Sequence, residues 1–214
     1  MITLIIIAIT VGVSILTMND LDLKNRFMFN AYAISHRREW WRFFSHGLLH
    51  ANFPHLFFNM YSLYLFGTFV ENTFKSDEFF GLAGGTAIYL FMYIGGLFFS
   101  SIYTYFKNKD NISYNALGAS GAVSAVVFAS ILLSPLSEMG LMLVPVMIPA
   151  WIFGFIYLAA SWFMARRNIG NIGHDAHFWG AVFGFILPII FKHELLSEFV
   201  FQIKLFFQFG GIPH

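Results

Sequence analysis

The sequence predicts an all-α membrane protein with six transmembrane helices, and three observations support this fold class. First, the 214 residues are 58% hydrophobic and only 11% charged, and the mean hydropathy is +0.69. Soluble domains usually carry about a quarter charged residues, so this chain cannot cover itself with polar surface. Second, six apolar stretches approach the length of a membrane crossing. Third, these stretches do not alternate as barrel strands do, which leaves helices as the spanning structure.

The six stretches lie between charged and turn-forming residues, and one helical crossing needs roughly 20 residues. They cover residues 2–18, 54–73, 79–102, 117–134, 140–164 and 175–192. The first lacks a basic leader and a small-residue cleavage site, so we expect a retained helix rather than a signal peptide. Together they predict one transmembrane domain over residues 1–193.

The tail, residues 194–214, is expected to lie at the membrane surface. Its apolar run from 199 to 209 is too short to cross, and Gln202, Lys204 and Gln208 interrupt it. An amphipathic segment of this kind is typical of an interfacial helix.

Composition also excludes several classes of function. The chain has no cysteine, so it has no disulfide, no thiolate metal site and no cysteine nucleophile. Its formal net charge of +1 gives no sign of a nucleic-acid partner.

The first chemical signal is a serine near the start of the fourth stretch. Ser120 lies between Gly118 and Gly121, which let the backbone bend and approach its neighbours closely. A helix N-terminus also offers free N–H groups and the positive end of the helix dipole. These are the parts of an oxyanion site. Taken alone, Ser120 also fits a small residue that lets two helices pack.

A histidine opens the sixth stretch, two crossings later, so His177 and Ser120 are expected on the same side of the bilayer. Ionisable groups at membrane depth are costly and are functional candidates. Gly180 and Gly184 follow on one helix face and form a stripe for close helix packing. Packing there would bring the serine hydroxyl within reach of the imidazole, as a general-base pair requires. A structural histidine in a polar pocket is the alternative.

The second stretch, parallel to the other two, begins with a third polar cluster. His55 and Asn59 are four residues apart, share a helix face and can donate hydrogen bonds to an oxyanion. No carboxylate is an evident third catalytic member, because Asp175 is two residues from His177 and lies on another face. The residues therefore predict a Ser-His dyad.

These residues resemble the motifs of rhomboid intramembrane serine proteases, in order along the chain. The matching motifs are a Trp-Arg pair, a His-x4-His-x3-Asn pattern, a Gly and a Glu in helix two, Gly-x-Ser-Gly, and Ala-His-x2-Gly-x3-Gly. They fall on Trp41, Arg42, His50, His55, Asn59, Gly67, Glu71, Gly118, Ser120, Gly121, Ala176, His177, Gly180 and Gly184. Each motif alone is weak, and their order makes the resemblance specific.

The resemblance implies a six-helix rhomboid-like bundle in which Ser120 is the nucleophile and His177 the general base and acid. His55, Asn59 and the Ser120 backbone N–H would form the oxyanion hole, and His50 would be structural. The implied substrates are single-pass transmembrane proteins in the lipid bilayer, with no cofactor and no metal. The implied location is a prokaryotic plasma membrane, as a multi-pass protein with the active-site face outside.

The resemblance also implies roles for the parts around the site. The first connection would be a membrane-embedded hairpin with Trp41 and Arg42 at the headgroups, and helix five with the loop 166–173 would form a gate and cap. One position departs from the family. Members often carry an aromatic residue four positions after the nucleophile, stacked on the catalytic histidine, and this chain has Ser124 there. Another aromatic residue, or the Ser124 hydroxyl, must then orient His177.

The charge distribution departs from the family as well. Nine of the twelve Lys and Arg residues lie in the connections on the Ser120 side. The positive-inside rule would place that face in the cytoplasm, whereas the family places it outside, and we follow the family.

Two other functions remain open from the sequence. A catalytically inactive rhomboid-like protein would bind membrane helices without cleaving them. A metal-dependent membrane hydrolase would use some of the eight histidines, although the chain has no His-Glu-x2-His motif.

Overall fold

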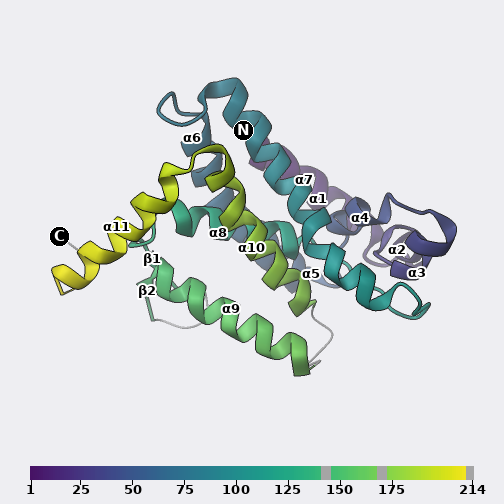
Figure 1. Cartoon of the computed structure of the whole chain (residues 1–214). Coiled ribbons are helices and arrows are strands. Elements are labelled where there is room, and N and C mark those ends of the chain that lie inside the picture. Colours follow the sequence, from purple (N-terminus) through teal and green to yellow (C-terminus); the bar gives the residue numbers. More distant parts are fainter. Residues whose placement is uncertain (141–145, 168–172, 211–214) are drawn as a thin grey trace.

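The computed structural model describes residues 1–140, 146–167 and 173–210, and most of these residues are helical (Figure 1). The helices before the site are α1 (Ile2–Thr17), α2 (Leu21–Phe27), α3 (Ala31–Arg37), α4 (Arg42–Ser45), η1 (His46–Leu48), α5 (Phe53–Ser62), η2 (Leu63–Gly67), α6 (Thr68–Lys75) and α7 (Gly81–Asn108). The later elements are α8 (Ser120–Leu133), β1 (Glu138–Met139), β2 (Ile148–Pro149), α9 (Ala150–Arg167), α10 (His174–Phe191) and α11 (Glu194–Gln208).

Helices occur in all six predicted stretches, and α5, η2 and α6 follow one another without a break through the second. By length and apolar character, α7 and α10 meet the criterion for a membrane crossing among the described residues, while α1 and α8 are apolar but shorter. The count of six crossings therefore stays a prediction. The tail forms α11, as expected, and its place at the membrane surface also stays a prediction.

The fifth helix begins later than predicted. The fifth apolar stretch predicts a start at residue 140, whereas α9 begins at Ala150. Strands β1 and β2 pair antiparallel instead, and the backbone N–H of Ala150 donates to the carbonyl of Ser137 at 2.8 Å. Pro149 explains the late start, because the residue before a proline is pushed into extended backbone. Residues 141–145 lie outside the described residues.

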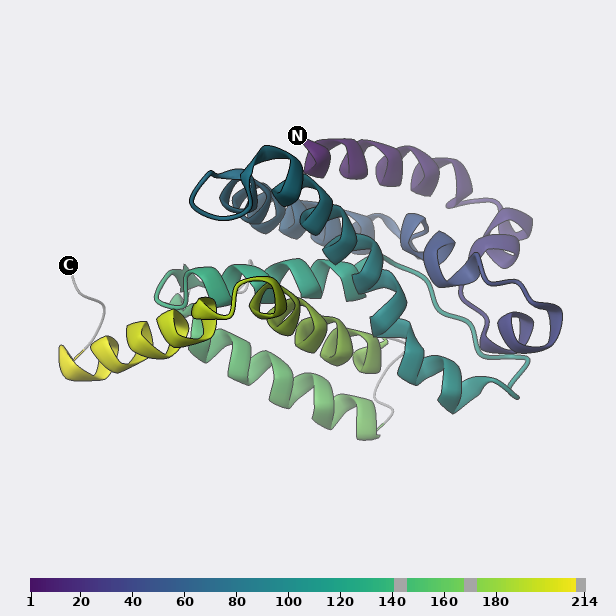
Figure 2. The same cartoon turned by 45° about the horizontal axis from the view of Figure 1, so that its top comes forward.

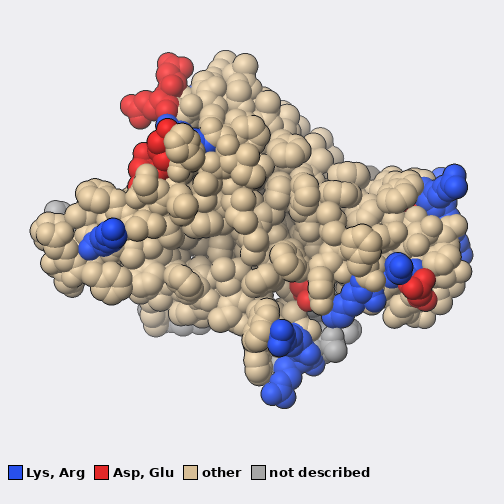
Figure 3. Space-filling model, in the orientation of Figure 1, with Lys and Arg blue, Asp and Glu red and all other residues tan. Residues whose placement is uncertain are grey.

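Helix α1 is polar on its buried face and apolar on its exposed face. Its buried residues are Thr3, Thr10, Ser14 and Thr17. Its large exposed residues beyond Met1 are Leu4, Ile5, Ile9, Ile15 and Leu16. This is the reverse of an amphipathic helix on a water-soluble protein, and it fits a helix with lipid around it. Figure 3 agrees, because the view shows Lys, Arg, Asp and Glu mainly at the extremities of a broad uncharged surface.

Helix α8 lies at the centre of the bundle and α9 at its edge. Eleven of the 14 residues of α8 are buried, against three of the 18 residues of α9. In Figure 2, α1 and α9 form opposite edges of the molecule, with α8 and α10 between them. The helix that begins with Ser120 is therefore held on several sides, whereas α9 is weakly anchored.

Candidate active site

The site begins with the close approach of α8 and α10. A Cβ atom added to Gly180 would collide with the carbonyl oxygen of Gly121, and one added to Gly184 would collide with that of Ala125. Backbone therefore packs on backbone along this seam, which confirms the predicted role of the glycine stripe. The carbonyl oxygen of Ala176 also lies 3.5 Å from the Cβ position of Gly121. The two helices thus bring their N-terminal ends together.

Ser120 and His177 occupy these neighbouring helix ends. Ser120 is the first residue of α8 and His177 the fourth of α10, and both side chains are partly exposed. Among the described residues, no hydrogen bond joins the two side chains. Catalytic hydrogen bonds often tighten only in the complex with substrate, so the arrangement is compatible with a nucleophile and its base.

Two rings flank the imidazole of His177. Tyr157 of α9 lies nearly parallel to it, with the ring centroids 6.2 Å apart and an interplanar angle of 20°. His174 meets it edge-on, with centroids 6.0 Å apart. The Tyr157 hydroxyl lies 2.6 Å from the Ser124 hydroxyl, within hydrogen-bonding distance. Tyr157 was not identified from the sequence. The only indication was Ser124, which stands where an aromatic residue was expected and implied that another group contacts His177.

His55 lies against the loop that leads into α8. Gly118 has a φ of +122°, and a Cβ there would lie only 2.7 Å from His55 Cε1. A side chain at position 118 would therefore be strained and would displace the His55 ring. The N–H of Gly118 donates to the carbonyl of His46 at 3.0 Å, which fixes the loop beside that ring.

Asn59 lies one helical turn after His55 and is buried. Its side-chain amide donates one hydrogen bond, 2.9 Å long, to the His55 carbonyl of its own helix. An amide NH₂ has two hydrogens, so one remains to be donated to another acceptor.

Two histidines before α5 are buried and tied to neighbouring helices. His50 Nδ1 lies 2.9 Å from the hydroxyl of Ser14, and that hydroxyl donates to the carbonyl of Leu48 at 2.8 Å. The hydroxyl must then accept from His50, which places the imidazole proton on Nδ1. His46 Nε2 lies 3.3 Å from the hydroxyl of Ser101. Burial lowers the pKa of His46 to about 4. Burial and two neighbouring histidines lower the pKa of His50 to about 3. Both are neutral at pH 7, and the contacts fit the structural role expected for His50.

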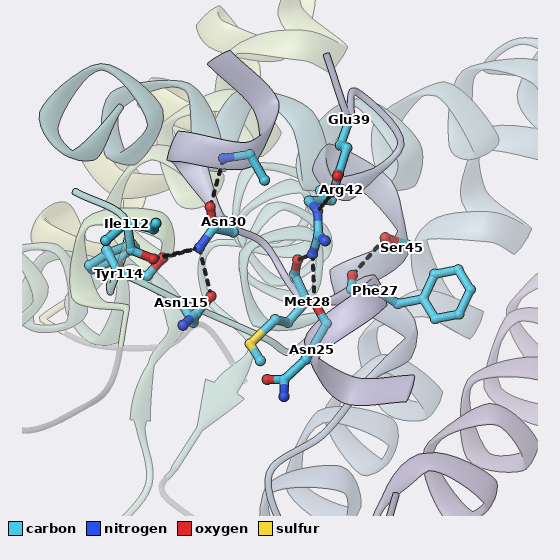
Figure 4. A network of polar contacts seen from close by, with 11 residues as sticks. Asn25, Phe27, Met28, Asn30, Glu39, Arg42, Ser45, Ile112, Tyr114 and Asn115 are labelled. Atoms are coloured by element: carbon cyan, nitrogen blue, oxygen red, sulfur yellow. Dashed lines mark hydrogen bonds and ion pairs between the residues drawn. The ribbon is translucent and has the colours of Figure 1, made fainter. Parts of the chain in front are cut away.

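Arg42 holds together the connection between α1 and α5 (Figure 4). Its guanidinium pairs with the Glu39 carboxylate and donates to the carbonyls of Asn25 and Met28 at 2.9 and 2.7 Å. Arg42 is buried, whereas the Trp41 side chain beside it is exposed. Arg42 therefore shapes this connection from within, and the headgroup-level position of the pair stays a prediction.

The same connection is bound to the segment that precedes Ser120. Phe29 and Ala116 exchange two backbone hydrogen bonds of 2.9 and 3.0 Å. The Asn30 amide donates to the carbonyls of Ile112 and Tyr114, as Figure 4 shows. The connection before α5 thus helps to position the start of α8.

Glu71 lies far from this cluster and anchors α1. It is fully buried and accepts from the backbone N–H groups of Ile2 and Thr3, from the Thr3 hydroxyl and from the Lys75 ammonium. A carboxylate at a helix N-terminus is stabilised by the free N–H groups and the helix dipole. Glu71 is 16 residues after His55, about 24 Å along a helix, which fits a structural position.

The carboxylate closest to His177 in the sequence is paired elsewhere. Asp175 forms an ion pair with Lys107 at 3.0 Å, and among the described residues no ion pair joins it to His177. Within the parts of the chain that the structure describes, no three His, Asp or Glu side chains gather as metal ligands would. Of the proposed cap, residues 168–172 lie outside the described residues.

Comparisons with known proteins point to one family. The model of the family described as Rhomboid domain matches residues 37–194. YdcA of Bacillus subtilis (strain 168), which carries a rhomboid-protease name, is 29% identical over 160 residues, or 71% of this chain and 67% of its own length. Rhomboid protease AarA of Providencia stuartii is 28% identical over 111 residues, or 48% of this chain and 37% of its own length.

Proposed function

The chain belongs to the rhomboid family, and on that premise we propose that it is an intramembrane serine endopeptidase with a Ser120–His177 dyad. Its substrates are single-pass transmembrane proteins, cut within or near the bilayer. The observation that supports this most directly is the backbone contact of α8 with α10, because it joins the helix end of Ser120 to that of His177. The His55 ring against Gly118 adds a hydrogen-bond donor beside the same helix start.

The reaction forms and breaks an acyl-enzyme. Ser120 Oγ attacks the scissile carbonyl carbon while His177 takes the hydroxyl proton. The oxyanion accepts hydrogen bonds from the Ser120 backbone N–H, Asn59 and His55. When the C–N bond breaks, His177 returns the proton to the leaving amine. A water molecule, deprotonated by His177, then attacks the ester carbonyl, and His177 returns that proton to Ser120 Oγ as the ester bond breaks.

The substrate has to present an extended peptide to this site. A transmembrane helix hides its peptide bonds in internal hydrogen bonds, so part of it must unwind first. Gly and Pro lower that cost, since they are about 1 and 3 kcal/mol less favourable than Ala in a helix. We therefore propose cleavage near helix-weakening residues.

The dyad is tested by fluorophosphonate labelling of the purified protein, which requires an activated serine and no cognate substrate. The wild type is expected to label. Ser130→Ala, a control that removes a serine near the other end of α8, is expected to label as well. Ser120→Ala and His177→Ala are expected not to label while keeping the wild-type thermal unfolding midpoint. Labelling of folded Ser120→Ala would contradict the assignment. An unlabelled, folded wild type would favour an inactive helix-binding protein, and chelator-sensitive cleavage would favour the metal-dependent hydrolase.

A further inference from the structure

We propose that Tyr157 is a positioning residue that holds the His177 imidazole, so that the orientation of the base depends on how α9 packs. This inference rests on the proposed function and adds a role for a helix that carries neither member of the dyad.

Tyr157 touches both helices of the dyad from a third one. Its ring lies nearly parallel to that of His177, 6.2 Å away, and its hydroxyl lies 2.6 Å from Ser124 Oγ on α8. Offset, near-parallel rings attract at such separations. The hydroxyl contact fixes the tyrosine relative to the helix of the nucleophile, and the ring contact fixes the base relative to the tyrosine. The geometry thus links the nucleophile helix to the base through one side chain.

Neighbouring aromatic rings hold Tyr157 in place. Phe153, one turn earlier on α9, lies nearly parallel to it with centroids 6.1 Å apart. Phe128 of α8 lies 5.6 Å away at 51°. A ring packed by two others and hydrogen-bonded at its hydroxyl has little freedom to rotate, so it offers His177 a fixed surface.

The ring contact between His174 and His177 is of a different kind. His174 precedes His177 by three residues on the same helix and meets its ring edge-on at 83°. Both residues lie on α10, so this ring contact does not join His177 to a second helix, as the contact with Tyr157 does. Asp175 is engaged with Lys107, so it does not orient the imidazole either.

Helix α9 is held less tightly than α8, against which it packs. Only Ala150, Gly154 and Ser161 of its 18 residues are buried, against eleven of 14 in α8. An outward shift of α9 would separate Tyr157 from Ser124 and His177 together. The base is then oriented while α9 is packed against α8, and an outward displacement of α9 would remove that support.

The first experiment compares Tyr157→Ala, Tyr157→Phe and Ser124→Ala with Phe155→Ala, a control on the exposed face of α9. Fluorophosphonate labelling at Ser120 is expected to slow about 10- to 100-fold in Tyr157→Ala, as for a weakened general base. Tyr157→Ala also loses packing against Phe128 and Phe153, so the unfolding midpoints are measured and labelling is compared at a temperature at which all variants are folded. Tyr157→Phe and Ser124→Ala should each slow labelling less than Tyr157→Ala. Their effects should not add, because both remove the same hydrogen bond between Tyr157 and Ser124. On a cleaved substrate, kcat should fall while KM stays unchanged.

A rescue separates positioning from general packing. In Tyr157→Ala the space beside His177 is vacated, and adding Ser124→Tyr offers a ring from α8 instead. This double variant is expected to recover labelling. A Tyr157→Ala protein that labels at the wild-type rate would overturn the inference while leaving the proposed function intact. A folded wild type without labelling at Ser120 would overturn both.

The dependence on α9 has its own test. A Cβ at Gly154 would lie 3.3 Å from Ile131 Cδ1 and 3.5 Å from Phe128 Cε1, so Gly154→Leu should push α9 away from α8. Labelling is expected to slow, and Tyr157→Phe should then cost nothing further. Wild-type labelling by Gly154→Leu, or a full additional loss from Tyr157→Phe, would contradict the coupling.

Discussion

The side chain of Asn59 uses only part of its hydrogen-bonding capacity within the fold. One hydrogen of its amide is bonded to the His55 carbonyl, and the other remains available. Asn59→Ala is expected to slow labelling and cleavage about 10- to 1000-fold, because it removes one oxyanion donor. Asn108→Ala is the matched control, since Asn108 donates to the carbonyl four residues earlier at the end of α7. An unchanged rate in Asn59→Ala would remove Asn59 from the oxyanion hole.

The same scale shows what the sequence could and could not predict. Ser120 and His177 could be proposed from the sequence because glycines at fixed spacing mark a close backbone approach, and α8 and α10 do approach closely. Tyr157 and Ser14 were not, because each reaches the site cluster from another helix and no local pattern records such a contact. The buried polar residues of α1 recur on one helix face, which indicates that this face packs inward but not which residue Ser14 contacts.

At the scale of whole elements, the distance between α8 and α10 depends on the absence of side chains. Gly180→Ala is expected to force the helices apart, because the new methyl group meets the Gly121 carbonyl. Overpacking of this kind typically costs about 1–3 kcal/mol. Labelling should fall together with the thermal unfolding midpoint. Gly12→Ala is the control, since a Cβ at Gly12 meets nothing within 4 Å. A Gly180→Ala protein with unchanged stability and labelling would contradict the tight seam.

Element boundaries were predictable where hydrophobicity alone sets them. The predicted and observed ends of α1 and α10 differ by at most one residue. The start of α9 was predicted wrongly, because the stretch before it is as apolar as a helix. Hydropathy does not show that Ile148 and Pro149 are held extended by the pairing of β1 with β2 and by the proline itself.

The molecule as a whole has an apolar outer surface and a core that contains polar side chains. Glu71 and the hydroxyls of α1 are buried, whereas many of the large apolar residues of α7, α9 and α10 are exposed. Composition alone predicts a membrane environment, because the excess of apolar residues does not depend on where they lie in the chain. The sequence does not give the direction in which the chain crosses the membrane. The positive-inside rule places the Ser120 side in the cytoplasm, whereas the family resemblance places it outside.

Orientation is therefore the prediction that belongs to the whole molecule. The chain contains no cysteine, so single cysteines can be introduced as reporters. Asn111 lies in the connection between α7 and α8, and Asp77 lies in the connection between α6 and α7, at the other end of α7. Both residues are exposed, and each is replaced by cysteine in a separate variant. With the active-site face outside, an impermeant maleimide should label Asn111→Cys in intact cells and Asp77→Cys only after permeabilisation. The reverse pattern would place Ser120 at the cytoplasmic face, as the nine basic residues on that side favour. Equal labelling of both in intact cells would contradict the crossing of α7 itself, and with it the six-helix topology on which the placement of Ser120 and His177 depends.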